Sequence, residues 1–137
     1  MNIVPEMMTK LAKCGSLIEI EEVILRSMLE LGQRVMQTYL ETLDDQLNSE
    51  APATHRVINR QPRMINFSFG PVTFKRRYYQ VEKAPNEFFL DRQLVLAPRS
   101  RQSPYLVKMM AKLGQATTMR NTAMALKMLL DSGVSHS

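Results

Sequence analysis

The stretch INFSFGPVTFKRRYY, residues 65–79, decides the fold of this chain. Apolar and polar residues alternate by twos on both sides of Gly70-Pro71, as they do in two strands that each bury one face. Gly can supply the positive φ that a tight hairpin turn needs first, and Pro can occupy the next position. The sequence therefore predicts an antiparallel hairpin that turns at Gly70-Pro71. The expected cross-strand pairs on its buried face are Phe67 with Phe74 and Phe69 with Val72.

Basic and aromatic residues are interleaved in the second half of this hairpin, in the run Lys75-Arg76-Arg77-Tyr78-Tyr79. Cations on a strand can meet phosphates while the neighbouring rings pack or stack, which favours nucleic-acid binding. The alternative is that Tyr78 belongs to the core and the cations are only solvated, because a strand places every second side chain on one face. The expected phosphate ligands of the hairpin region are Arg63, Lys75, Arg76 and Arg77.

Before the hairpin, the sequence predicts one long amphipathic helix from Leu17 to Leu47. Its apolar residues recur at steps of three and four without a proline, and Ser16 with Glu19 forms a capping box. At about 1.5 Å per residue the helix is roughly 45 Å long, more than a small domain covers. Either part of it packs against another chain, or it folds across its own domain. Its carboxylates are expected to form a solvated face: Glu19, Glu21, Glu22, Glu30, Glu41, Asp44 and Asp45.

After the hairpin, we expect a third short strand at Glu87–Leu90 and a loop over residues 94–101. The pair Ser103-Pro104 is a strong helix start, because Ser is a good N-cap and Pro is favoured at the first helical position. An apolar stripe at helical spacing follows it, and Gly114 is expected to end this helix.

A second short helix is expected from Thr117 or Thr118 to Gly133, so that a helical pair ends the chain. The tail, residues 132–137, is typical of the turn of a helix-turn-helix, with Ser135 placed to cap a further helix. The sequence stops before that helix, so we interpret the pair as an incomplete helix-turn-helix. Phosphate contact and simple solubility explain its cations equally well: Lys108, Lys112 and Arg120.

Charge is distributed unevenly along the 137 residues. Residues 1–50 hold four basic and nine acidic residues, whereas residues 51–137 hold 14 basic and four acidic ones. A basic part joined to an acidic part indicates a polyanion partner, of which nucleic acid is the commonest. The alternative is a basic surface that only keeps the protein soluble. The single cysteine, Cys14, excludes an internal disulfide framework.

Catalytic chemistry is not visible in the sequence. Two-metal nuclease chemistry needs several converging carboxylates, and the basic part offers only Glu82, Glu87, Asp91 and Asp131. His55 and His136 have no second His or Cys nearby, and no Gly-rich phosphate loop occurs. We therefore expect no enzyme activity, no metal, no cofactor and no small-molecule substrate. No stretch is apolar enough to span a membrane and no leader is evident, so we expect a cytoplasmic protein.

Taken together, these features resemble the amino-terminal region of bacterial insertion-sequence transposases of the ISLre-two type, long catalogued as an uncharacterised protein family. The hairpin motif is the most specific part of the resemblance, which extends over nearly the whole chain. The sequence departs from the family at Pro71, where an acidic residue is usual, and at Arg92 and Val95, where Glu and Gly are expected. The matching segments are Leu17–Leu47, Phe69–Tyr79, Phe89-Leu90-Asp91 with Leu94 and Leu96, Ser103-Pro104, and Val134-Ser135-His136.

The resemblance implies a protein of transposition and DNA recombination, encoded by a mobile element, whose amino-terminal part binds DNA. It also implies a later ribonuclease-H-like catalytic domain, which would make this chain a truncated product or fragment without catalytic residues.

The sequence as a whole predicts an α+β protein in three segments: a long acidic helix (residues 1–50), a basic hairpin or three-stranded sheet (residues 51–101) and a helical pair (residues 102–137). The expected function is DNA binding within a transposase-like protein, with homo-oligomerisation through the long helix as a further expectation. The alternative is a helix-mediated oligomerisation or interaction module without a nucleic-acid role.

Overall fold

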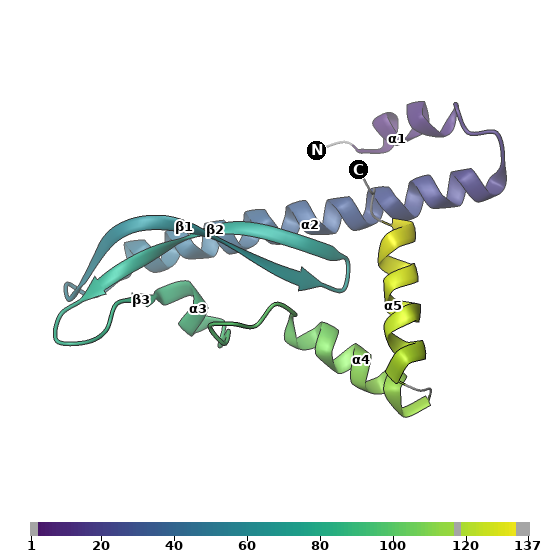
Figure 1. Cartoon of the computed structure of the whole chain (residues 1–137). Helices are drawn as coiled ribbons and strands as arrows, with labels where there is room; N and C mark the ends of the chain where they lie inside the picture. Colours follow the sequence, from purple (N-terminus) through teal and green to yellow (C-terminus); the bar gives the residue numbers. More distant parts are fainter. Residues whose placement is uncertain (1–2, 117–118, 134–137) are drawn as a thin grey trace. The chain divides into compact units, whose positions relative to one another are not determined.

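The computed structural model describes residues 3–116 and 119–133 and confirms the α+β fold (Figure 1). A three-stranded antiparallel sheet follows a long helix, and further helices follow the sheet. The chain divides into two compact units. Unit 1 comprises Met1–Gln33, Ser68–Gly70 and Pro104–Ser137, and unit 2 comprises Arg34–Phe67 and Pro71–Ser103. The elements in chain order are α1 (Ile3–Leu11), α2 (Leu17–Ser49), β1 (His55–Phe67), β2 (Gly70–Val81), β3 (Glu87–Phe88), α3 (Phe89–Gln93), α4 (Pro104–Ala116) and α5 (Met119–Gly133).

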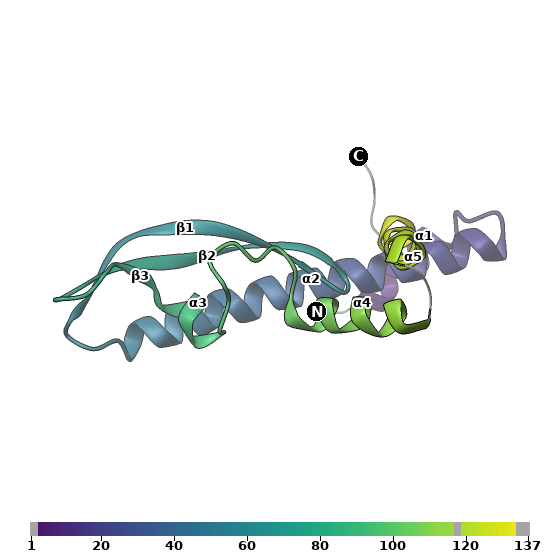
Figure 2. The ribbon, with the colours of Figure 1, turned by 60° about the horizontal axis from the view of Figure 1, so that its bottom comes forward.

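Unit 2 is built on the sheet, whose strand order is β1-β2-β3. Helix α3 and the loop after it lie against one face of the hairpin (Figures 1 and 2). The loop is tied to β1 by two backbone hydrogen bonds: Asn66 N–H donates to Arg101 O (2.7 Å), and Ser103 N–H donates to Asn66 O (2.9 Å). The buried apolar side chains of this unit come from α2, β1, β2 and α3: Leu40, Ile65, Val72, Phe74, Tyr79, Phe89 and Leu90.

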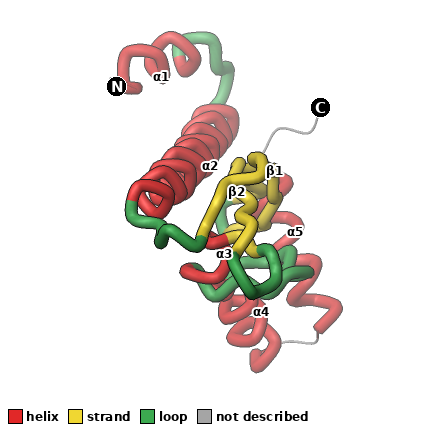
Figure 3. Tube along the Cα trace, turned by 90° about the vertical axis from the view of Figure 1, so that its left-hand side faces the viewer, coloured by secondary structure: helices red, strands yellow, loops and turns green. Residues whose placement is uncertain are grey.

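The second half of α2 lies beside β2 (Figure 3). Two of its carboxylates accept hydrogen bonds from backbone N–H groups of β2. Glu41 Oε2 accepts a hydrogen bond from Lys75 N–H (2.9 Å), and Asp44 Oδ1 accepts one from Arg77 N–H (3.2 Å). Strand β3 pairs with β2 only at Tyr78 and Tyr79, directly beyond these positions. An unpaired strand edge invites pairing with other chains, so these carboxylates both satisfy and protect the edge.

The hairpin turn differs from the sequence prediction. Its two turn residues are Ser68 and Phe69, and Gly70 begins β2. Both predicted pairings are therefore wrong. Phe69 lies in the turn and cannot pair with Val72, and a turn at Ser68-Phe69 places Phe67 opposite the start of β2 rather than opposite Phe74. Gly70 does have a positive φ of 120°, but this conformation is needed directly after the two-residue turn rather than within it.

The third strand is shorter than predicted, because the chain turns into α3 at Phe89. Phe89, Leu90 and Asp91 are all buried, whereas a strand covered on one face buries only every second residue. The first turn of α3 distributes Phe89, Leu90 and Asp91 around the helix, and the surrounding elements bury all three. The predicted loop over residues 94–101 contains no helix or strand, as expected.

In unit 1, the hairpin turn packs on the first half of α2. Gln33 Nε2 donates a hydrogen bond to Phe69 O (2.8 Å). A Cβ atom at Gly32 would lie 3.2 Å from the Phe69 ring, so glycine allows this close approach. The predicted capping box at the start of α2 is confirmed, since Glu19 N–H donates to Ser16 Oγ (3.2 Å).

Helices α4 and α5 contact each other, and each contributes one buried leucine, Leu106 from α4 and Leu126 from α5. Helix α4 begins at Pro104 as predicted but continues past Gly114 to Ala116. Residues 132 and 133, predicted to begin a turn, still belong to α5. The predicted caps at Thr117 or Thr118 and at Ser135, and His136, lie outside the described residues. No described helix is long and apolar enough to cross a membrane.

Candidate nucleic-acid interface

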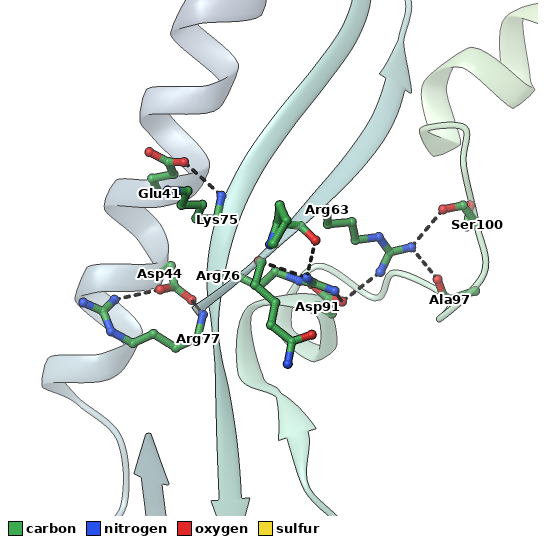
Figure 4. Close-up of polar contacts among 11 residues, drawn as sticks. Glu41, Asp44, Arg63, Lys75, Arg76, Arg77, Asp91, Ala97 and Ser100 are labelled. Atoms are coloured by element: carbon green, nitrogen blue, oxygen red, sulfur yellow. Dashed lines mark hydrogen bonds and ion pairs between the residues drawn. The ribbon is translucent and has the colours of Figure 1, made fainter. Parts of the chain in front are cut away.

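Two of the predicted phosphate ligands, Arg63 and Arg76, converge on the carboxylate of Asp91 (Figure 4). Arg63 Nη1 lies 2.8 Å from Asp91 Oδ2, and Arg76 Nε lies 3.2 Å from Asp91 Oδ1. Arg63 also donates to the carbonyls of Ala97 and Ser100, at 2.6 and 2.9 Å.

Arg76, on β2, has further partners on the other two strands of the sheet. Its Nη1 donates to the carbonyls of Gln61 (3.0 Å) and Pro62 (2.9 Å), and its guanidinium carbon lies 3.6 Å from the ring centroid of Phe88. The side chains of Arg63 and Arg76 are only 7% and 8% exposed. Releasing them to a phosphate would leave Asp91 buried without a counter-charge, which is strongly unfavourable. We therefore correct the sequence interpretation: Arg63 and Arg76 hold the unit together.

Arg77 is also engaged within unit 2. Its Nη1 lies 2.7 Å from Asp44 Oδ2 and 2.7 Å from Asp45 Oδ1. Burial alone would lower the pKa of Arg77, but the hydrogen bonds to Asp45 and Asp44 outweigh burial and raise the pKa above its ordinary value. Arg77 is therefore a poorer phosphate ligand than its sequence position indicates. The expected solvated face of the helix is also wrong at Asp44, which is 1% exposed.

Lys75 is the predicted hairpin ligand whose side chain stays exposed. Its backbone N–H bonds to Glu41, while its ammonium group makes no ion pair within the described chain. Two exposed arginines of β1, Arg56 and Arg60, likewise lack a carboxylate partner among the described residues, and Arg56 donates to the Gln80 side chain (2.6 Å). The sequence pattern does not single out these two arginines, because they lie before the basic and aromatic run Lys75–Tyr79.

Unit 2 carries most of the net positive charge of the chain. It contains 11 basic and seven acidic residues, an excess of four, whereas the whole chain has an excess of five. Ion pairs occupy four arginines and four carboxylates of this unit: Arg63, Arg76, Arg77 and Arg92 with Asp44, Asp45, Glu87 and Asp91. The exposed cations of the hairpin and its loops that have no ion pair among the described residues are Arg56, Arg60, Lys75, Lys83, Arg99 and Arg101.

A shallow cavity of about 400 Å³ opens where the strands of the hairpin end. Arg56 and Lys83 both line it, together with Thr54 and Glu82. The two cations suit a phosphate, although the charge of Glu82 opposes an anion.

The remaining predicted ligands lie in unit 1. Lys108 and Lys112 are exposed on α4. Arg120 lies in α5, and its side chain is outside what the structure describes. The prediction that these three residues contact DNA stays a prediction.

His55 has a role that sequence analysis missed. Its Nε2 lies 2.7 Å from Glu87 Oε1, and its ring packs against those of Tyr79 and Phe89. Glu87 is also paired with Arg92 at 2.9 Å. Glu87 lies 32 residues from His55 in the chain, so no local pattern could have revealed the pair. Among residues 3–116 and 119–133, no group of three His, Cys, Asp or Glu side chains is arranged to hold a metal ion.

Comparison with known proteins places the chain in a family. Residues 11–136 match the family described as "Uncharacterised protein family (UPF0236)". The chain belongs to UPF0236. A relative from Streptococcus gallolyticus, named "UPF0236 protein in vanSb 3'region", is 31% identical over 137 residues. That alignment covers 99% of this chain and 30% of the relative, so the chain spans under a third of the relative's length. No solved structure matches.

Proposed function

We propose that this UPF0236 chain is the DNA-binding amino-terminal part of a transposase-like protein. The observation that carries the proposal is the row of exposed cations on the hairpin, Arg56 and Arg60 on β1 and Lys75 on β2. A two-stranded ribbon fits the major groove of duplex DNA, and cations along it can contact the phosphates at the groove edges.

The internal ion pairs support this proposal because they separate two kinds of cation. Arg63, Arg76 and Arg77 fix the shape of unit 2, and the exposed cations remain for an outside anion. Most of the excess positive charge of the chain also lies in this unit. The transposase assignment rests on the hairpin motif Phe69–Tyr79, which resembles insertion-sequence transposases of the ISLre-two type.

The proposal assigns no catalysis to this chain. Asp44, Asp91 and Glu87, three of the carboxylates of unit 2, are occupied by arginines or by His55. We expect no cleavage of duplex DNA by the pure protein with Mg²⁺ or Mn²⁺. Metal-dependent cleavage that co-purifies with the protein would contradict this.

A salt titration of duplex binding tests the DNA proposal. Fluorescence anisotropy gives log K against log salt for the wild type and for the double variant Arg60→Gln, Lys75→Gln. Each phosphate contact contributes about 0.9 to the slope of log K against log salt. The slope of the variant should therefore be smaller by the contribution of roughly two contacts. The matched control, Lys10→Gln with Lys13→Gln, removes two cations from the acidic end of the sequence and should leave the slope unchanged.

Two results would contradict the proposed surface or the proposal itself. An unchanged slope in the hairpin variant would move the contacts elsewhere. Absence of duplex binding at low salt would overturn DNA binding and favour an interaction module. Competition with duplex RNA distinguishes the two nucleic acids, because the deep, narrow major groove of RNA excludes a protein ribbon.

A further inference from the structure

The first half of α2 exposes apolar side chains around two carboxylates. Leu17 and Ile18 are 76% and 72% exposed, and a shallow groove of about 340 Å³ runs over this surface. Neighbouring exposed apolar side chains rimmed by charged residues are typical of an interaction site. We call this surface the acidic α2 face; its residues are Leu17, Ile18, Glu21, Glu22 and Leu25.

Helix α4, in the same unit, exposes a surface of the opposite charge. Tyr105 and Val107 are 62% and 53% exposed, and Lys108 and Lys112 lie one helical turn apart beside them. We call this surface the basic α4 face; its residues are Tyr105, Val107, Lys108, Ala111 and Lys112.

The two faces are complementary in charge and in length. The acidic α2 face runs from Leu17 to Leu25 and the basic α4 face from Tyr105 to Lys112, which is about 12 Å and about 10 Å along the helix axes. Within the described residues, Glu21 and Glu22 have no cationic partner, and Lys108 and Lys112 have no carboxylate partner. Both faces stay exposed in one copy of the chain, so they do not cover each other within it.

We propose that the acidic α2 face of one copy docks on the basic α4 face of a second copy. Burial of the apolar side chains supplies most of the affinity, and the four charges select the partner face. Because the contact joins two different faces, each copy can contribute its acidic α2 face to one contact and its basic α4 face to another. Two copies that make both contacts with each other form a closed dimer. The apolar residues around Lys108 and Lys112 favour this partner over a phosphate backbone, which offers nothing to bury Tyr105 and Val107.

Charge reversal tests the pairing in the absence of DNA. The two variants are Glu21→Lys with Glu22→Lys, and Lys108→Glu with Lys112→Glu. Sedimentation velocity at several concentrations should show self-association of the wild type and at least about tenfold weaker association of each variant alone, because like charges then meet. An equimolar mixture of the two variants should associate as the wild type does, since each reversed face then meets its opposite in the other variant.

The controls separate this result from misfolding and from DNA binding. Circular dichroism should show the same helix content in all variants. Reversal of two exposed carboxylates of unit 2, Glu50→Lys with Glu82→Lys, should leave the association unchanged. A monomeric wild type at high concentration, unweakened association of either variant, or failure of the mixture to associate would each overturn the proposal. A loss of duplex binding by the Lys108 and Lys112 variant without a change in self-association would assign these lysines to DNA instead.

Discussion

In unit 2 the second half of α2 turns its carboxylates onto β2, whereas in unit 1 the first half of the same helix leaves its carboxylates in solvent. Asp44 is 1% exposed and binds both the backbone and the side chain of Arg77. Glu21 and Glu22 are exposed and lie among exposed apolar residues. Each half of the helix carries an adjacent pair of carboxylates, Glu21-Glu22 and Asp44-Asp45, so this local pattern alone does not decide what a carboxylate binds.

Strand β2, which lies beside the second half of α2, explains why the carboxylates of the two halves differ. Strand β2 presents backbone N–H groups and arginines that need acceptors, and Glu41 and Asp44 provide them. Unit 2 therefore uses charge to hold its own elements together. In the described part of unit 1, no arginine or strand N–H group binds Glu21 or Glu22, so both carboxylates are available to a partner.

Replacement of Asp91 by Asn should show most clearly that unit 2 depends on its internal charges for stability. The variant leaves two buried guanidinium groups, Arg63 and Arg76, without their counter-charge, and should lower the free energy of unfolding by about 3–5 kcal/mol. Urea unfolding followed by circular dichroism measures the change. Glu50→Gln, which neutralises an exposed carboxylate without an ion pair among the described residues, is the control and should stay within about 0.5 kcal/mol of wild type. Equal effects of the two variants would show that unit 2 does not depend on its internal charges.

The sequence predicts what depends on local periodicity. The helix α2, the existence of the hairpin and the start of α4 follow from residue spacing and capping residues within a few positions of each other. The sequence mispredicts the position of the hairpin turn, because Gly70-Pro71 is itself a typical turn pair. Contacts of Phe69 with Gly32 and Gln33 accompany the actual turn, and they join positions 36 or more residues apart.

The candidate site was less predictable than the fold. Neighbouring residues of the basic run have opposite roles, since Arg76 is buried on Asp91 while Lys75 is exposed. The alternation of a strand predicts that they face opposite ways, but not which of them meets a carboxylate. That choice depends on α3, whose residue Asp91 lies 15 positions from Arg76 and 28 from Arg63.

Replacement of Val95 by Gly should stabilise unit 2 by removing a strained residue from its loop. Val95 has a φ of 55° and is 85% exposed, so it adopts a left-handed conformation without any packing in return. Such a conformation costs a β-branched residue about 1–2 kcal/mol, and part of the gain is lost because Gly makes the unfolded chain more flexible. We expect stabilisation of roughly 1 kcal/mol in urea unfolding. Val95→Ala serves as the control, because it removes the branched side chain and keeps the Cβ atom; equal stabilisation by Ala would contradict backbone strain as the cause.

The smallest expected effect concerns pH and Glu87. Burial alone would raise the pKa of Glu87, but hydrogen bonds from His55 and Arg92 outweigh burial and lower the pKa below its ordinary value of 4.5. A carboxyl group with a lowered pKa in the folded state stabilises the fold at pH values above its unfolded pKa, and this stabilisation is lost as the pH falls through the folded pKa. The wild type should therefore exceed Glu87→Gln in unfolding free energy by up to about 1 kcal/mol at neutral pH, with the difference shrinking below pH 4.5. Urea unfolding of both proteins between neutral and acidic pH measures this difference, and a difference that stays constant through the acidic range would show that the Glu87 charge does not support unit 2.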